Sequence, residues 1–193
     1  MGTRCDAPVW SAHSQNGTIY DLSHVHPFFL KYTLPPQPGK PGRPGFAELV
    51  IRIYVVFSHH CFSRNLKNVQ TYTEEEIYED KGRKERRVFC LVRWQLSKKL
   101  APLLKRAAGR KCYHTGKHNF FTVELDGGGA IGEDYVIYFR AERSQLVDIE
   151  LTIESAYMRT DKPHLSKALG KINLNAILRN ALKGTQAHPP PQK

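Results

Sequence analysis

The stretch "VDIELTIESAYMR", Val147 to Arg159, has the most regular alternation of apolar and polar residues in the chain. A period of two is typical of a strand that buries one face and turns the other toward water. The stretch therefore predicts a half-buried strand. The residues that we expect to point inward are Val147, Ile149, Leu151 and Ile153.

Two strand-like stretches precede it, "NFFTVELD" (residues 119–126) and "DYVIYFRAER" (residues 134–143). The turn-rich segments "DGGGAIGED" and "RSQL" separate the three, and they predict an antiparallel meander. In the middle strand, one face is apolar and the other carries Val136, Tyr138, Arg140 and Glu142.

A further strand is predicted in "FAELVIRIYVVFSHHCF", Phe46 to Phe62, where the odd-numbered residues from Leu49 to Cys61 form the core face. His60 falls on the other face, with Arg52 and Tyr54. We expect the strand to run out at the rim of a cleft, with His59 tucked in and His60 on the open side.

The other elements are less regular. Strand-like text on both sides of "DKG", Asp80 to Gly82, predicts a hairpin, with a short helix over residues 73–80 as the alternative. "SKKLAPLLKRAAG" predicts a helix that Ser97 can cap and in which Pro102 fits only the first turn. A last helical segment opens at Thr160 or Asp161 before Pro163, and resumes at Asn173 until Gly184.

The pattern predicts an α+β fold, an antiparallel sheet of four to six strands with helices packed on one face. We expect four parts along the chain. They are an N-terminal arm and Pro/Gly-rich loop (1–45), an α+β core (46–160), a C-terminal helical segment (161–184) and a disordered tail (185–193).

The chain is strongly basic. Its 29 Lys and Arg against 18 Asp and Glu give a formal charge of +11, which favours an anionic partner, RNA more than DNA. The four cysteines show no CxxC spacing, there is no signal peptide pattern, and no apolar run approaches the ~18 residues of a membrane span. We therefore expect a cytoplasmic protein without a membrane partner. The C-terminal helix is the expected contact surface for a protein partner.

Three groups of residues carry candidate chemistry. In "SHHCFSR", His60 can exchange a proton near neutral pH and Arg64 can hold a phosphate, so the segment suits RNA cleavage without a metal. The structural alternative is a core His59 and a solvated Arg64. A second group lies on the last two strands: Tyr138, Arg140, Arg143, Glu154, Tyr157 and Arg159.

The second group suits RNA because cations meet phosphates and rings stack on bases. Its structural alternative is ion pairing of Arg140 with Glu150 or Glu154. The third group is Cys112, His114 and His118, which with Cys61 or His59 would supply four zinc ligands. Because the paired CxxC half is absent, the sequence predicts no metal site and no cofactor. Cys112 beside His114 is also a candidate nucleophile.

The order of a helix followed by "FFTVEL", "YVIYFRAER" and "DIELTIESAYMR" resembles the RelE-like messenger-cleaving toxins of bacterial toxin–antitoxin pairs, over roughly residues 95–160. The resemblance rests on element order and on "YFRAER". It implies that Arg140 and Arg143 match phosphate-binding arginines. It also implies that Tyr157 and Arg159 match active residues near the last strand.

Three functions follow as hypotheses. The first is a metal-independent endoribonuclease that uses His60, Arg140 and Tyr157. The second is a non-catalytic module that binds a polyanion, and the third is an assembly component. The residues expected to contact nucleic acid are Arg52, Arg64, Arg143, Arg159, Lys98 and Lys105.

Overall fold

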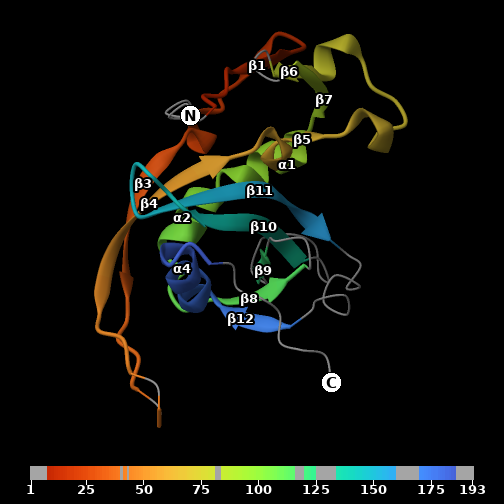
Figure 1. The fold of residues 1–193 in the computed structure, drawn as a ribbon. Helices are drawn as coiled ribbons and strands as arrows, with labels where there is room; N and C mark the ends of the chain where they lie inside the picture. Colours follow the sequence, from red (N-terminus) through yellow and green to blue (C-terminus); the bar gives the residue numbers. More distant parts are fainter. Residues whose placement is uncertain are drawn as a thin grey trace.

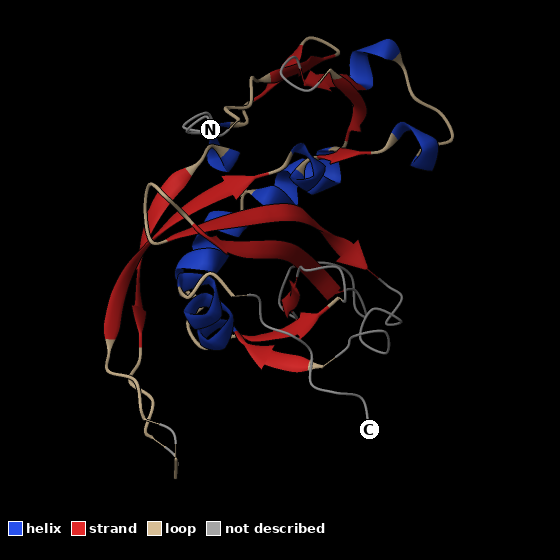
Figure 2. Cartoon of the chain, in the orientation of Figure 1, coloured by secondary structure: helices blue, strands red, loops and turns tan. Residues whose placement is uncertain are grey.

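The computed structural model describes residues 8–39, 41–42, 44–80, 84–115, 120–124, 134–159 and 170–185. It has a mixed α and β architecture with many strands and few helices, so the α+β class is confirmed at this level. Figures 1 and 2 show a large curled sheet at the centre and a smaller strand-rich part above it. The large sheet has seven strands in the order β12-β8-β9-β10-β11-β4-β3.

The predicted meander forms one half of this sheet. Neighbouring strands pair antiparallel from β8 through β11, and β12 pairs antiparallel with β8. The strand β12 was not expected, since the sequence around it predicted only the start of a helix. The strands are β8 (Lys111–His114), β9 (Phe120–Glu124), β10 (Asp134–Arg143), β11 (Ile149–Arg159) and β12 (Lys171–Asn173).

The other half is a hairpin of β3 (Phe28–Leu34) and β4 (Leu49–Phe57), and it joins the meander by a parallel pairing of β4 with β11. The expectation of an antiparallel sheet of four to six strands is therefore corrected on two points. The described sheet has seven strands and contains one parallel pair. A parallel pair needs a long crossover. Here the chain between β4 and β11 passes through two helices, at residues 91–97 and 100–105, and through the strands β8, β9 and β10.

The hairpin β3–β4 extends away from the body of the protein (Figure 1). Near its tip Gln37 and Phe46 form an isolated bridge, and a Cβ at Gly45 would lie 2.6 Å from the Gln37 carbonyl oxygen. Only glycine fits so close an approach. The expected boundary between the N-terminal arm (1–45) and the α+β core (46–160) thus falls in the connection between β3 and β4, two strands that pair with each other.

A smaller sheet in the order β5-β7-β6 lies beyond the end of β4. The predicted hairpin around residues 81–83 is confirmed by the antiparallel pairing of its two strands, although these three residues lie outside the described part. The alternative helix over residues 73–80 is reduced to a single 3-10 turn, η4 (Glu74–Glu76). The strands are β5 (Ser63–Arg64), β6 (Ile77–Asp80) and β7 (Glu85–Phe89), and a separate hairpin joins β1 (His13–Gln15) to β2 (Thr18–Tyr20).

Three α-helices are described: α1 (Leu91–Ser97), α2 (Leu100–Lys105) and α4 (Leu174–Leu182). Ser97 does not cap the second helix as expected, because it ends the first one. Pro102 does lie in the first turn of α2, and the Asn173 side chain caps α4 by accepting from the Asn175 N–H. Three further 3-10 turns are η1 (Ser23–Val25), η2 (His59–Cys61) and η3 (Leu66–Asn68). The helix opening expected at residues 160–163 and the tail from residue 186 lie outside the described part of the chain.

One apolar core joins the sheet to the helices. Ile51, Ile53, Val55 and Phe57 of β4 are buried as expected, whereas Leu49 at the start of the strand is largely exposed. The apolar side of α4 lies in this same core, so a protein partner would have to contact its other side. No helix among the described residues is both long and apolar enough to cross a membrane.

Phe57 fills the core at the point where β4 ends, and its side chain is 0% exposed, against 69% for Phe29 on the neighbouring strand. We expect Phe57→Ala to lower the free energy of unfolding by about 3–5 kcal/mol, because it leaves a cavity in the core. Phe29→Ala is the matched control; it loses mainly a ring contact with Tyr54 and should cost less than about 1.5 kcal/mol. Urea unfolding of both variants measures this, and equal losses would contradict the assigned core.

Candidate functional site

The candidate site lies where β4 and β11 end. Phe57, the last residue of β4, pairs in register with Ile153 of β11, and both strands run in the same direction. The turn η2, which carries the two histidines, follows β4 and packs against the continuation of β11. The Ser58 N–H and the Cys61 thiol both donate to the Ile153 carbonyl. The parallel pairing therefore brings "SHHCFSR" beside "ESAYMR", two segments about ninety residues apart in the sequence.

A β-bulge decides which side chains of β11 face this region. Tyr138 pairs with Ser155 but Phe139 pairs with Ile153, so Glu154 is an extra residue in β11. Strict alternation from Ile153 would point Tyr157 into the core; the bulge shifts the alternation by one residue. Ala156 is buried instead, and Tyr157 pairs with Val136, on the same face as Tyr138.

Four half-buried side chains form a cluster on this face, which we call the arginine–tyrosine cluster: Arg93, Tyr138, Tyr157 and Arg159. The Tyr138 and Tyr157 rings stack with centroids 5.8 Å apart and planes 17° apart. The Arg93 guanidinium carbon lies 4.7 Å from the Tyr157 ring centroid, and Arg159 donates to the Tyr138 hydroxyl at 3.2 Å. The four side chains thus form a continuous row of contacts, in which the two stacked rings lie between the two arginines.

Arg93 also ties the site to the end of β4. Its Nη1 donates to the carbonyl oxygens of His60 at 3.0 Å and of Ser63 at 2.8 Å. Burial lowers the pKa of Arg93, yet an arginine remains charged at neutral pH. Its other guanidinium nitrogens make no hydrogen bond to the described residues, so they can donate to a bound anion.

The prediction for the two histidines is confirmed: the His59 side chain is 1% exposed and the His60 side chain 41%. His59 Nε2 lies 3.1 Å from Glu85 Oε2, His60 Nε2 lies 3.9 Å from Glu85 Oε1, and His59 Nδ1 lies 3.8 Å from Asp80 Oδ2. Burial lowers the pKa of His59, while Glu85 opposes the shift. Burial, assisted by the Arg87 charge, lowers the pKa of His60 to about 4. Both imidazoles are therefore neutral at pH 7.

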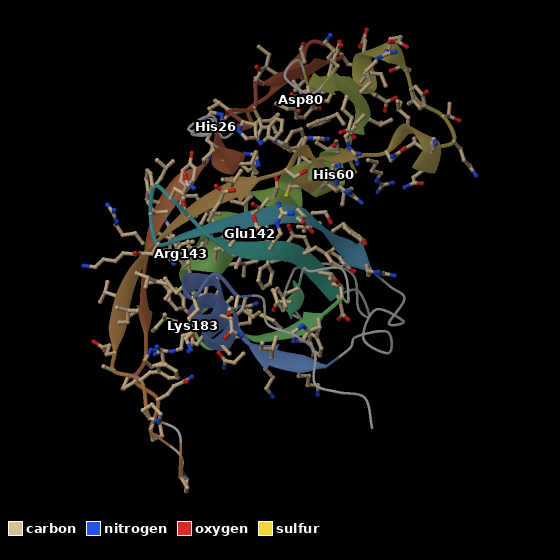
Figure 3. The ribbon with its side chains drawn as sticks, in the orientation of Figure 1. His26, His60, Asp80, Glu142, Arg143 and Lys183 are labelled. Atoms are coloured by element: carbon tan, nitrogen blue, oxygen red, sulfur yellow. The ribbon has the colours of Figure 1, made fainter. Side chains whose placement is uncertain are left out.

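Arg87 fixes the carboxylate between the histidines. Its Nη1 donates to Glu85 Oε1 at 2.9 Å and its Nε donates to the Ser63 hydroxyl at 2.9 Å. The Arg87 side chain is buried and the Glu85 side chain is partly exposed, so only the arginine side of this ion pair is shielded from water. Figure 3 shows His60 and Asp80 at this end of the protein, the first from η2 and the second from β6.

The third group from the sequence does not assemble in the described residues. Cys112 and His114 lie on β8, in a different part of the sheet from His59 and Cys61, and His118 lies outside the described residues. Burial raises the pKa of the Cys61 and Cys112 thiols to about 12, which leaves neither as a thiolate at neutral pH. Cys112 is thus a poor nucleophile, since the thiolate is the reactive form.

The structure separates the expected nucleic-acid contacts into two regions. Arg64 is exposed on β5 next to the site, and its charge lowers the pKa of Arg93 together with the larger effect of burial. Arg143 lies at the other end of β10, roughly 17 Å from Tyr138 at about 3.4 Å per residue, opposite Ile149. Figure 3 shows it far from His60. Arg52 lies at that same distant end, beside Ile53, which pairs with Ile149.

Three other predicted site residues, Arg140, Lys98 and Lys105, contact side chains of the protein itself. Arg140 forms ion pairs with Glu142 at 3.4 Å and Glu154 at 4.0 Å, so the pairing alternative describes its surroundings. Lys98 lies 3.5 Å from the Trp94 ring centroid, and Lys105 lies 5.9 Å from that of Phe28. Neither lysine contacts the arginine–tyrosine cluster.

Sequence reasoning missed Arg93, Glu85, Arg87 and Asp80. Arg93 lies on the short helix α1, which was not expected from the sequence. In the predicted hairpin around Asp80 to Gly82, Tyr78 pairs with Arg87 and Glu79 pairs with Arg86. Nothing in the sequence indicated that the end of this hairpin meets the histidines, because that contact is not local.

Comparison with known families gives one result. The model of the YjaZ family matches residues 11–182, which include both strand ends and all residues of the site. The chain belongs to the YjaZ family. The description of the family names no activity. Neither the curated proteins nor the solved structures contain a match to the chain.

Arg93 supplies a prediction about stability. We expect Arg93→Lys to lower the free energy of unfolding by about 1–3 kcal/mol, because an ammonium lacks the planar fork that bonds two carbonyls and stacks on Tyr157. Arg64→Lys, at an exposed arginine, is the matched control and should change it by less than about 0.5 kcal/mol. Denaturant unfolding compares the two. An equal loss of unfolding free energy in both variants would show that the Arg93 contacts add no stability beyond that of an exposed arginine.

Proposed function

We propose that this YjaZ family protein binds single-stranded RNA on the arginine–tyrosine cluster. The observation that carries the proposal is the contact of two arginines and two stacked tyrosines at one end of the sheet. Guanidinium groups suit phosphates, and tyrosine rings suit exposed bases. Single strands are favoured over duplexes because their bases are free to reach aromatic side chains.

The charge of the chain supports the same function. A net charge of +11 attracts a polyanion from a distance, and the exposed Arg64 lies close to Arg93. Binding should therefore weaken steeply with added salt, since each phosphate contact releases counterions. The resemblance to messenger-cleaving toxins, which covers Tyr157 and Arg159, stays a prediction that points to the same ligand.

Two surface arginines provide a matched test of the site. We expect Arg64→Ala to weaken binding of a labelled single-stranded RNA about 5- to 10-fold at low salt and to reduce the salt slope by about 1. Arg143→Ala removes the same charge at the distant end of β10 and should weaken binding less than about 2-fold. Fluorescence anisotropy at several salt concentrations measures both. Equal losses would show diffuse electrostatic attraction without this site, and no binding by the wild type would refute the proposal.

RNA cleavage is the second candidate, and the placement of His60 favours it. Its imidazole is neutral, partly exposed and next to a charged arginine, whose Nη1 holds the His60 carbonyl. A neutral imidazole can take the proton of a 2′-hydroxyl; that oxygen then attacks phosphorus, and the bond to the 5′-oxygen breaks as that oxygen takes a proton from solvent water. The products would be a 2′,3′-cyclic phosphate and a free 5′-hydroxyl. Tyr157 is another candidate for a group that acts on the phosphate, and Arg140 would first have to leave its ion pairs with Glu142 and Glu154.

Cleavage is tested with end-labelled RNA in the presence and absence of a chelator. We expect cyclic phosphate ends that persist with chelator, and a rate at least about 100-fold lower for His60→Gln. Glutamine keeps a polar side chain of similar reach, and His60 is exposed enough to tolerate it. RNA that binds without being cut would leave a binding module, and cleavage that survives the substitution would exclude His60 as the base.

A further inference from the structure

We propose that His59, His60 and Glu85 form a binding site for a divalent transition metal ion, zinc in the first instance. Among the described residues, these three form the one group of histidine, cysteine or acidic side chains whose ligand atoms all lie within 4.8 Å of one another. Two imidazoles and a carboxylate are a donor set that zinc takes in proteins. The inference concerns a second ligand beside the arginine–tyrosine cluster and does not depend on RNA binding.

The spacing of the ligand atoms suits a tetrahedral shell. Bonds of 2.0–2.1 Å at tetrahedral angles place neighbouring ligand atoms about 3.3 Å apart. His59 Nε2 and Glu85 Oε2 already lie 3.1 Å apart. The ligand atoms of all three side chains lie within 4.8 Å of one another, and His60, whose side chain is 41% exposed, is the residue that would move inward to complete the shell.

The surroundings orient His59 for this role. Its ring is buried against the edge of Trp10, with centroids 5.5 Å apart, so it cannot turn freely. The Asp80 carboxylate lies 3.8 Å from Nδ1, which is beyond hydrogen-bond distance but close enough for an electrostatic interaction. A carboxylate that comes within hydrogen-bond reach of a ligating histidine would fix its tautomer and make the other nitrogen a better ligand.

Two carboxylates supply the negative charge that a cation needs at this site. Glu85 and Asp80 together offset the positive charges of Arg87, which pairs with Glu85, and of Arg93, which bonds the His60 carbonyl. Arg87 holds Oε1 of Glu85, so Oε2 is the oxygen that faces His59. Both the His60 and Glu85 side chains are 41% exposed, which leaves an open fourth position for water. An open position is typical of catalytic zinc sites rather than structural ones.

Zinc binding is tested by titrating ZnCl₂ into the full chain without an affinity tag, in a calorimeter. We expect one ion per chain, and an affinity about 100-fold lower in Glu85→Gln, which keeps the hydrogen bonding but loses the anionic ligand. Glu142→Gln is the matched control, because Glu142 also pairs with an arginine but has no histidine beside it, and its affinity should equal that of the wild type. Asp80→Asn should lower the affinity about 10-fold.

Two further measurements keep the outcome clear. Zinc should raise the melting temperature of the wild type and of Glu142→Gln but not of Glu85→Gln, and Co²⁺ should give the visible absorption of a tetrahedral site only in the first two. His60→Gln replaces Glu85→Gln if the latter fails to fold. Absence of zinc binding by the wild type, or unchanged affinity in the folded Glu85 or His60 variant, would overturn the proposal.

Discussion

The parallel pairing of β4 with β11 is the constraint on which the rest of the structure depends. Because both strands run in the same direction, their carboxyl ends lie at one edge, and the two segments with the most polar chemistry meet there. An antiparallel pairing would have put the histidines of η2 at the opposite end of β11 from Tyr157. The pairing also leaves the β4 side of β11 unpaired beyond Ile153, where η2 and the Arg93 side chain occupy the space.

One extra residue in β11 then determines which side chains lie on the outer face at the end of this strand. The extra Glu154 turns Tyr157 away from the core and lets the small Ala156 take the buried position. A buried tyrosine hydroxyl at that position would need its own hydrogen-bond partner, whereas alanine needs none. The bulge therefore places a small side chain in the core and turns the Tyr157 ring toward Tyr138, and re-aiming a side chain is a common role of bulges.

The sequence predicted the local features and missed those that depend on distant contacts. Alternation in β4, β10 and β11 follows from a period of two, which needs only neighbouring residues. The expected burial of His59 and exposure of His60 are confirmed, but the two residues lie in the 3-10 turn η2 and not on the strand from which they were predicted. The parallel pair could not be derived, because the strand order depends on a crossover of about ninety residues. The bulge leaves only a one-residue shift in the pattern. The α1 sequence is short and apolar at both ends, and such a segment reads equally well as strand or helix. Arg93 and Glu85 were overlooked for these reasons.

Each proposed site contains one buried or half-buried arginine, and the two arginines have different partners. Arg93 belongs to the arginine–tyrosine cluster, and Arg87 pairs with Glu85 of the proposed zinc site. Arg93 stacks on Tyr157 and donates to the His60 and Ser63 carbonyls, while Arg87 forms an ion pair with Glu85. Burial and the Arg87 charge lower the pKa of both imidazoles, and Arg93 lowers that of His60 further, so both imidazoles remain neutral. A neutral imidazole is what either a metal ion or a proton transfer requires, but the same nitrogen of His60 cannot serve both at once. If both ligands bind, the cation at Glu85 would add to the field that attracts phosphate. By linkage, each ligand would then strengthen the binding of the other to the same extent.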